Sequence, residues 1–204
     1  MPLVIYPRVR KTFGRIAALT CVAVFVSSGA AFAAQCPTQS AKQKFSKWGD
    51  SSDYFLVPGG SFEGTPAQVG WTLSGATLTP GNEPFHIDGI TDDQSLLIDG
   101  GGSATSPAFC VDSTMPSIRF FVRQTARGSD LKLQGVAQSP RGPLSMTLAD
   151  FSDGSLPMWT PVQVTVATNR IPKGFSVSAA MRFVVSGSGS WQIDDMYVDP
   201  YRAG

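Results

Sequence analysis

The stretch that decides the fold is residues 175–185, which read FSVSAAMRFVV. Apolar side chains occupy every second position from Phe175 to Val185, and the positions between them include Ser176 and Arg182. Alternation of period two is typical of a β-strand that packs one face on a core and turns the other toward water. We therefore expect these residues to form a long strand of an antiparallel sheet.

The same alternation recurs in shorter runs along the chain. It is found in residues 118–123, 131–133, 144–148 and 162–166. Clusters of Gly, Pro, Asn, Asp and Ser separate these runs, and such spacing is typical of a β-sandwich or barrel. We predict a single all-β domain, an antiparallel β-sandwich over residues 54–204, preceded by an N-terminal arm over residues 34–53.

Composition supports a packed, turn-rich globular protein. Of the 204 residues, 42% are hydrophobic and 15% charged, with 21 Gly and 15 Pro. The net charge is +1, but four basic residues and no acid precede position 34. The remainder holds twelve basic and fifteen acidic residues, a net charge of −3. A weakly acidic body without a basic run argues against a nucleic-acid partner.

The first 33 residues have the layout of a secretory signal peptide. Residues 8–15 are rich in basic side chains, residues 16–26 are an apolar run of eleven, and residues 31–33 read Ala-Phe-Ala. This order of regions predicts export and cleavage near Ala33. A permanent anchor needs about twenty apolar residues, so we expect membrane contact only during export and a secreted mature protein.

The cysteines agree with an oxidising destination. Cys21 leaves with the signal peptide, and Cys36 and Cys110 remain. Two cysteines in an exported protein usually pair, which predicts a disulfide that fastens the arm to the body. Two free thiols or an intermolecular bond are the alternatives.

Three short landmarks frame the body: GGSFE at residues 59–63, GW at residues 70–71 and WQIDDMYV at residues 191–198. In this order they resemble the jelly-roll family of carbohydrate-binding modules and their galactose-binding-like relatives, over residues 57–198. Pro58 stands where that family often has Asn, a small departure. The ending WQIDDMYVDP also resembles small secreted actinobacterial proteins of unassigned function, a likeness that carries no activity.

The resemblance implies a jelly roll with a structural calcium ion and no other cofactor. In that family a Glu of the opening motif and an Asp of the closing motif often bind calcium, which implies Glu63 with Asp194 or Asp195 here. If Ile193 faces the core, Asp195 shares its face and Asp194 does not. The alternative is that Glu63 pairs locally and the aspartates are solvated at a strand edge.

Aromatic and planar polar side chains on one strand could form a sugar-binding face. Arg119, Phe121 and Arg123 share the face of residues 118–123 that points away from the core, and Arg182 belongs to the same face on another strand. Guanidinium groups bind carboxylates in paired geometry, which would favour uronic acids. The alternative is an ordinary solvated face, in which arginine stems cover Phe121.

A catalytic set is poorly supported. His86 is the only histidine, no G-x-S-x-G sequence is present, and most aspartates lie in apparent turns. We therefore predict no enzyme activity. The first hypothesis is a secreted, non-catalytic module that binds carbohydrate or a cell-wall polymer. The second is an envelope β-sandwich that binds another protein and no sugar, and a small secreted hydrolase ranks third.

Overall fold

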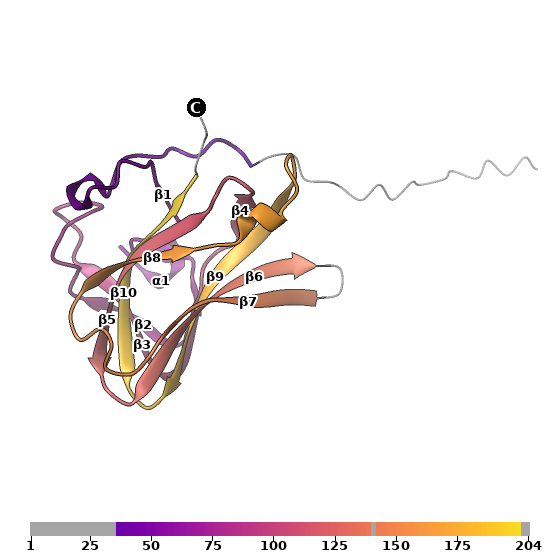
Figure 1. Ribbon diagram of the computed structural model, residues 1–204. Coiled ribbons are helices and arrows are strands. Elements are labelled where there is room, and N and C mark those ends of the chain that lie inside the picture. Colours follow the sequence, from indigo (N-terminus) through magenta and orange to yellow (C-terminus); the bar gives the residue numbers. More distant parts are fainter. Residues whose placement is uncertain (1–35, 140–141, 201–204) are drawn as a thin grey trace, which may run out of the picture. The chain divides into compact units, whose positions relative to one another are not determined.

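A computed structural model describes residues 36–139 and 142–200 (Figure 1), and the predicted signal peptide lies outside these residues. The strands of the described chain pair antiparallel in one sheet and helices are few and short, so the predicted fold class is confirmed. The strands are β1 (Phe55–Leu56), β2 (Thr72–Pro80), β3 (Gln94–Thr105), β4 (Phe109–Asp112), β5 (Ser117–Ala126), β6 (Ser129–Ser139), β7 (Gly142–Phe151), β8 (Thr160–Thr165), β9 (Ser176–Gly187) and β10 (Ser190–Asp199). The short helices are η1 (Ser46–Trp48), α1 (Pro66–Val69) and η2 (Thr168–Arg170). None of the helices in the described chain is long and apolar enough to cross a membrane.

The strands form one curled sheet. Seven follow the order β7-β6-β9-β3-β10-β5-β8, while β1 pairs with β10, β2 with β3 and β4 with β9. Strands β3 and β10 separate β9 from β5 in this order, yet the rings of Phe120 on β5 and Phe183 on β9 lie 5.2 Å apart between centroids. The sheet therefore folds over on itself, and its two halves enclose the core as a sandwich (Figure 1).

The alternating residues supply that core along much of β5, β6 and β9, whereas Phe175 and Val177 at the start of the longest run are 39% and 38% exposed. Phe183 and Val185 of β9 are buried, as are Leu131 and Leu133 of β6. The interpretation of residues 144–148 as a core-covered strand is corrected in part. Leu144 and Met146 of β7 are 63% and 46% exposed, because the end of the β6–β7 hairpin runs past the covered part of the sandwich (Figure 1).

The first and last strands lie side by side. Phe55 of β1 pairs with Val198 of β10, and the Met196 N–H donates to the Gly60 carbonyl at 2.9 Å. A Cβ at position 60 would lie 2.8 Å from the Met196 carbonyl oxygen. The two chain segments therefore approach too closely for a side chain, which is the physical reason for glycine in the opening landmark.

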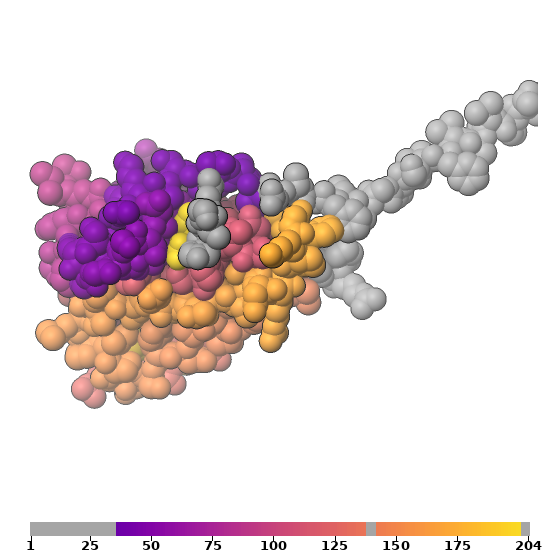
Figure 2. Space-filling model, turned by 45° about the horizontal axis from the view of Figure 1, so that its top comes forward, coloured from indigo at the N-terminus to yellow at the C-terminus, as the bar shows by residue number. Residues whose placement is uncertain are grey.

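Residues 36–53 run over the outside of the sheet as an arm (Figure 2, indigo). Cys36 is bonded to Cys110 on β4, with 5.5 Å between their Cα atoms, which confirms the predicted disulfide. Further along, Lys42 pairs with Tyr54 in an isolated β-bridge. Phe45 is completely buried against the sheet.

Candidate metal centre and aromatic surface

A bulge in β10 changes the direction of its two aspartates. The pairing of β10 with β5 shifts between Asp194 and Tyr197, and Asp195 has a positive φ of 47°. As a result Met196, and not Asp195, follows Ile193 into the main core. The expectation that Asp195 shares the face of Ile193 is wrong, since it assumed unbroken alternation.

Asp195 instead faces two aspartates of the loop between β2 and β3. Carboxylate oxygens of Asp88, Asp92 and Asp195 all lie within 4.8 Å of one another. Asp195 is 1% exposed, and neither of its oxygens has a hydrogen-bond partner. Oδ2 of Asp92 is also buried and unpartnered.

These three carboxylates fit a hard cation. Burial, reinforced by neighbouring carboxylates that include Glu83 and Asp88, raises the pKa of Asp195 to about 8. An isolated buried carboxylate is costly, and calcium or magnesium binds oxygen ligands of this kind. The residues present could therefore hold a metal ion, which would neutralise their charge.

The structure places the other two predicted ligands in local roles. Glu63 accepts hydrogen bonds from the N–H groups of Asp93 and Gln94, both at 2.9 Å. Asp194 accepts from the N–H of Glu83 at 3.1 Å and from that of Asp195 at 2.9 Å. Neither belongs to the three-carboxylate cluster. Sequence reasoning missed Asp88 and Asp92 because aspartates among turn residues usually serve local hydrogen bonding.

Several contacts fix the loop that carries these aspartates. The buried carboxylate of Glu83 accepts hydrogen bonds from the N–H groups of Phe85 and Ile87. Asp88 accepts from the Tyr197 hydroxyl at 2.8 Å and pairs with Lys44 of the arm at 3.0 Å. The loop is thus fastened to both β10 and the arm.

Phe121 does not lie on an open face, whether a sugar-binding face or a solvated one covered only by arginine stems, and both expectations are corrected. Its side chain is 0% exposed, with ring centroids of Phe45, Trp48 and Phe85 at 6.2, 5.7 and 5.4 Å. The arm supplies two of these rings and the loop between β2 and β3 supplies the third. Alternation within residues 118–123 identified the face correctly but contains no information about what covers it.

The half-buried rings around Phe121 form a surface of their own. Trp48, Phe85 and Trp159 pack against the cluster that contains Phe121 and remain partly exposed. The Lys47 ammonium lies 4.4 Å from the Trp48 ring centroid, and the Arg123 guanidinium lies 4.8 Å from that of Trp159. We call these three rings and two cations the aromatic surface.

One buried amide side chain, that of Gln192, holds the Arg123 head of the aromatic surface. Nε of Arg123 donates to Oε1 of Gln192 at 2.6 Å, and Nε2 of Gln192 donates to the Ser95 hydroxyl at 3.2 Å. The Arg123 head is therefore oriented by a hydrogen-bonded chain that runs across β10 to β3. Such fixed polar groups beside apolar rings are typical of small-molecule and sugar sites.

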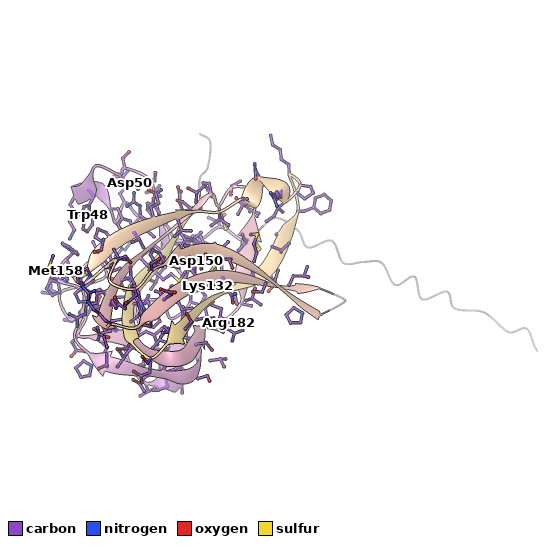
Figure 3. All side chains as sticks on the ribbon, turned by 60° about the horizontal axis from the view of Figure 1, so that its bottom comes forward. Trp48, Asp50, Lys132, Asp150, Met158 and Arg182 are labelled. Carbon is purple, nitrogen blue, oxygen red and sulfur yellow. A yellow bond between two sulfur atoms is a disulfide. The ribbon has the colours of Figure 1, made fainter. Side chains whose placement is uncertain are left out.

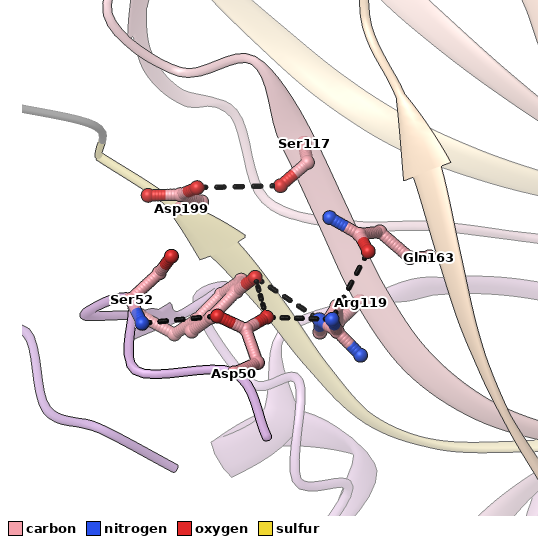
Figure 4. Close-up of polar contacts among 7 residues, drawn as sticks. Asp50, Ser52, Ser117, Arg119, Gln163 and Asp199 are labelled. Carbon is pink, nitrogen blue, oxygen red and sulfur yellow. Dashed lines mark hydrogen bonds and ion pairs between the residues drawn. The ribbon is translucent and has the colours of Figure 1, made fainter. Parts of the chain in front are cut away.

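Arg119 fastens the arm (Figure 4). It forms an ion pair with Asp50 at 2.5 Å and donates to the Tyr54 hydroxyl and to Oε1 of Gln163, both at 3.0 Å. These partners occupy the Arg119 head, so its contacts are those of a structural residue.

Arg182 is not brought to this surface. It lies exposed on β9, opposite Gln134 of β6, and β3 and β10 stand between its strand and β5. Figure 3 draws it with Lys132 and Asp150, apart from Trp48 and Met158.

Comparisons with known proteins bear on the fold. No protein-family model matches the sequence, and a comparison with curated proteins found no match. The CBM22-1 xylan-binding domain of Paenibacillus barcinonensis Xyn10C is similar in structure, with a TM-score of 0.52 and 13% identity over 82% of this chain and 100% of that domain. The likeness is one of fold.

Two further solved structures are more distantly similar. The C-terminal family 22 carbohydrate-binding module of Clostridium thermocellum Xyn10B has a TM-score of 0.48 and 16% identity over 74% of this chain and 96% of that one. A family 11 module from Clostridium thermocellum has a TM-score of 0.42 and 13% identity over 72% and 96%.

Proposed function

We propose that this protein is a secreted, non-catalytic module that binds a polysaccharide through the aromatic surface. The observation that carries the proposal is that Trp48, Phe85 and Trp159, three partly exposed rings, all pack against the buried cluster that contains Phe121. Flat rings supply apolar area with fixed orientation, and the Lys47 and Arg123 cations lie over the Trp48 and Trp159 rings, where they add charged donors.

Xylan is the first polymer to test. The structurally similar Paenibacillus domain is described as xylan-binding, and both sandwiches share a fold. The two cations of the aromatic surface favour chains that carry carboxylates, because guanidinium and ammonium groups form charge-assisted hydrogen bonds with them. We therefore expect xylan substituted with uronic acids to bind more tightly than the unsubstituted chain.

The cation at Asp88, Asp92 and Asp195 is proposed to be calcium. Carboxylates make up the whole cluster, and calcium accepts six to eight oxygen ligands in flexible geometry. When bound, the ion supplies positive charge that offsets the buried carboxylates. Glu83 then holds the loop between β2 and β3 through the Phe85 N–H, and this loop presents Phe85 to the aromatic surface.

The test is retention of the mature protein on insoluble xylan, chitin, cellulose and bacterial cell wall. We expect retention on xylan, and about tenfold or greater loss of affinity in Trp159→Ala, as for removal of a central aromatic contact. Phe175→Ala is the matched control, because Phe175 is a partly exposed ring outside the aromatic surface. Equal retention of wild type and Trp159→Ala would contradict the proposal, as would no retention on any polymer.

A further inference from the structure

A second concave site lies on the inner face of β6, β7 and β9, outside the aromatic surface and the metal centre. It is a groove of about 380 Å³ between these strands and the segment 166–171, which contains η2. Most of its lining is apolar, including Leu144, Met146 and Leu148 of β7. Figure 1 shows the β6–β7 hairpin that forms one wall, running beside β9.

Small residues explain why the groove is hollow. Leu133 pairs with Phe183 across β6 and β9, and both fill the core. Along the same face the next positions of β6 are Gly135 and Ala137, and Ala137 pairs with Ala179. The sheet continues there with little side-chain volume, so the core opens into a groove that ends among the exposed side chains of β7.

The groove carries one charge. Arg170 is the only charged residue of its lining, and within the described chain it forms no ion pair. Thr168 also lines the groove, and its side chain is 4% exposed. Its hydroxyl has no hydrogen-bond partner in the described parts of the chain. The segment at η2 therefore offers a cation and a hydroxyl to an otherwise apolar groove.

We propose that the groove binds a free long-chain fatty acid. The acyl chain would lie along Leu144, Met146 and the floor of small residues, and the carboxylate would bind Arg170 and the Thr168 hydroxyl. The volume falls within the range of about 300–1,000 Å³ that is usual for ligand sites, which are mostly apolar with a few placed polar groups. A carboxylate complements the unpaired guanidinium, with which it forms two parallel hydrogen bonds.

The test is calorimetric titration of the mature protein with dodecanoate and with dodecan-1-ol, both below their aggregation limits. We expect dodecanoate to bind about tenfold more tightly, as for a hydrogen bond to a charged group. Arg170→Gln should reduce the affinity for dodecanoate to that for the alcohol. Arg182→Gln, which changes an exposed arginine of β9 outside the groove lining, should leave both affinities unchanged.

A second variant tests the groove itself. Gly135 lines the groove, and a Cβ there would meet the Leu148 side chain at 3.6 Å, an ordinary contact, so we use Gly135→Leu to place a larger side chain in the groove. We expect at least tenfold weaker binding of both ligands, with a thermal melt showing that the variant is folded.

Three results would overturn the proposal. One is no binding of dodecanoate by the wild type, and another is undiminished binding by folded Gly135→Leu. The third is a dimer in sedimentation velocity that Gly135→Leu dissociates, because a second copy of the chain would then be the occupant.

Discussion

Asp195 occupies its place because the β10 bulge turns it out of the main core and toward the loop between β2 and β3. There it meets Asp88 and Asp92, and no N–H or O–H group of the described chain donates to its carboxylate. At the scale of the residue, a carboxylate removed from water without donors destabilises the fold unless a cation or a proton neutralises it.

Asp195→Asn should therefore change stability in opposite directions with and without calcium. In EGTA at a pH above 8, where the Asp195 carboxylate is ionised, the variant should melt above the wild type, because the unpartnered charge is gone. At free calcium about 100 times its dissociation constant, the wild type should gain about 2.7 kcal/mol, or roughly 5–10 °C, and the variant almost nothing. Differential scanning calorimetry measures both.

Asp99→Asn is the matched control, since Asp99 is an exposed aspartate outside the cluster. It should follow the wild type in both buffers. A calcium-induced rise in Tm that Asp195→Asn retains would contradict the site.

Gly60→Ala should destabilise the closure between the first and last strands. Its Cβ would lie 2.8 Å from the Met196 carbonyl oxygen and 2.9 Å from that of Val57, so the backbone must shift. We expect a loss of about 1–3 kcal/mol in the free energy of unfolding, measured in urea. Gly135→Ala, where the new Cβ has room, should cost less than half as much.

The arm is the element that changes the character of a whole sheet face. It places Phe45 and Trp48 over Phe121, and Asp50 engages Arg119. The face of β5 predicted to be solvated is therefore largely interior, and the aromatic surface is built partly from the arm itself.

Loss of the disulfide between the arm and β4 should lower the free energy of unfolding. Replacing Cys36 and Cys110 together by serine removes a crosslink between residues 74 positions apart. The chain-entropy model predicts a loss of up to about 4 kcal/mol in the free energy of unfolding. Urea unfolding of the double variant and the oxidised wild type measures it, and equal midpoints would show that other contacts alone hold the arm.

Alternation in the sequence predicted strands β5 to β9, the fold class and much of the core, because period two reports burial within a strand, but it did not identify β1 to β4. It did not predict the β10 bulge at Asp195, which is one extra residue with no distinctive composition. It also did not predict that the arm and the loop between β2 and β3 cover Phe121. These are contacts between segments distant in sequence, and periodicity contains no information about them.

At the scale of the whole described chain, the metal centre and the aromatic surface share one loop. Asp88 and Asp92 belong to the cluster, while Phe85, a few residues earlier, contacts Trp48 with 5.2 Å between ring centroids. Lys44 of the arm also pairs with Asp88. A change at the metal centre can therefore reach the proposed glycan site through a short chain of contacts.

Calcium removal should accordingly weaken glycan binding without abolishing it. EGTA should lower xylan affinity several-fold, because the loop between β2 and β3, which presents Phe85, loses order. Trp159 lies outside that loop, in the connection between β7 and β8, and should keep its position. Affinity electrophoresis in xylan gels with and without EGTA measures the ratio. Identical mobilities would show that the two sites are independent.

The most direct test follows the four tryptophan indole N–H signals during an NMR titration of the mature, ¹⁵N-labelled protein with xylohexaose. Trp71 and Trp191 are buried and donate to Pro58 and Ser129, so their signals should stay in place. The signals of Trp48 and Trp159 should shift together and saturate. Saturating ligand that leaves these two unmoved, or that shifts Trp71 and Trp191 instead, would contradict a glycan site on the aromatic surface.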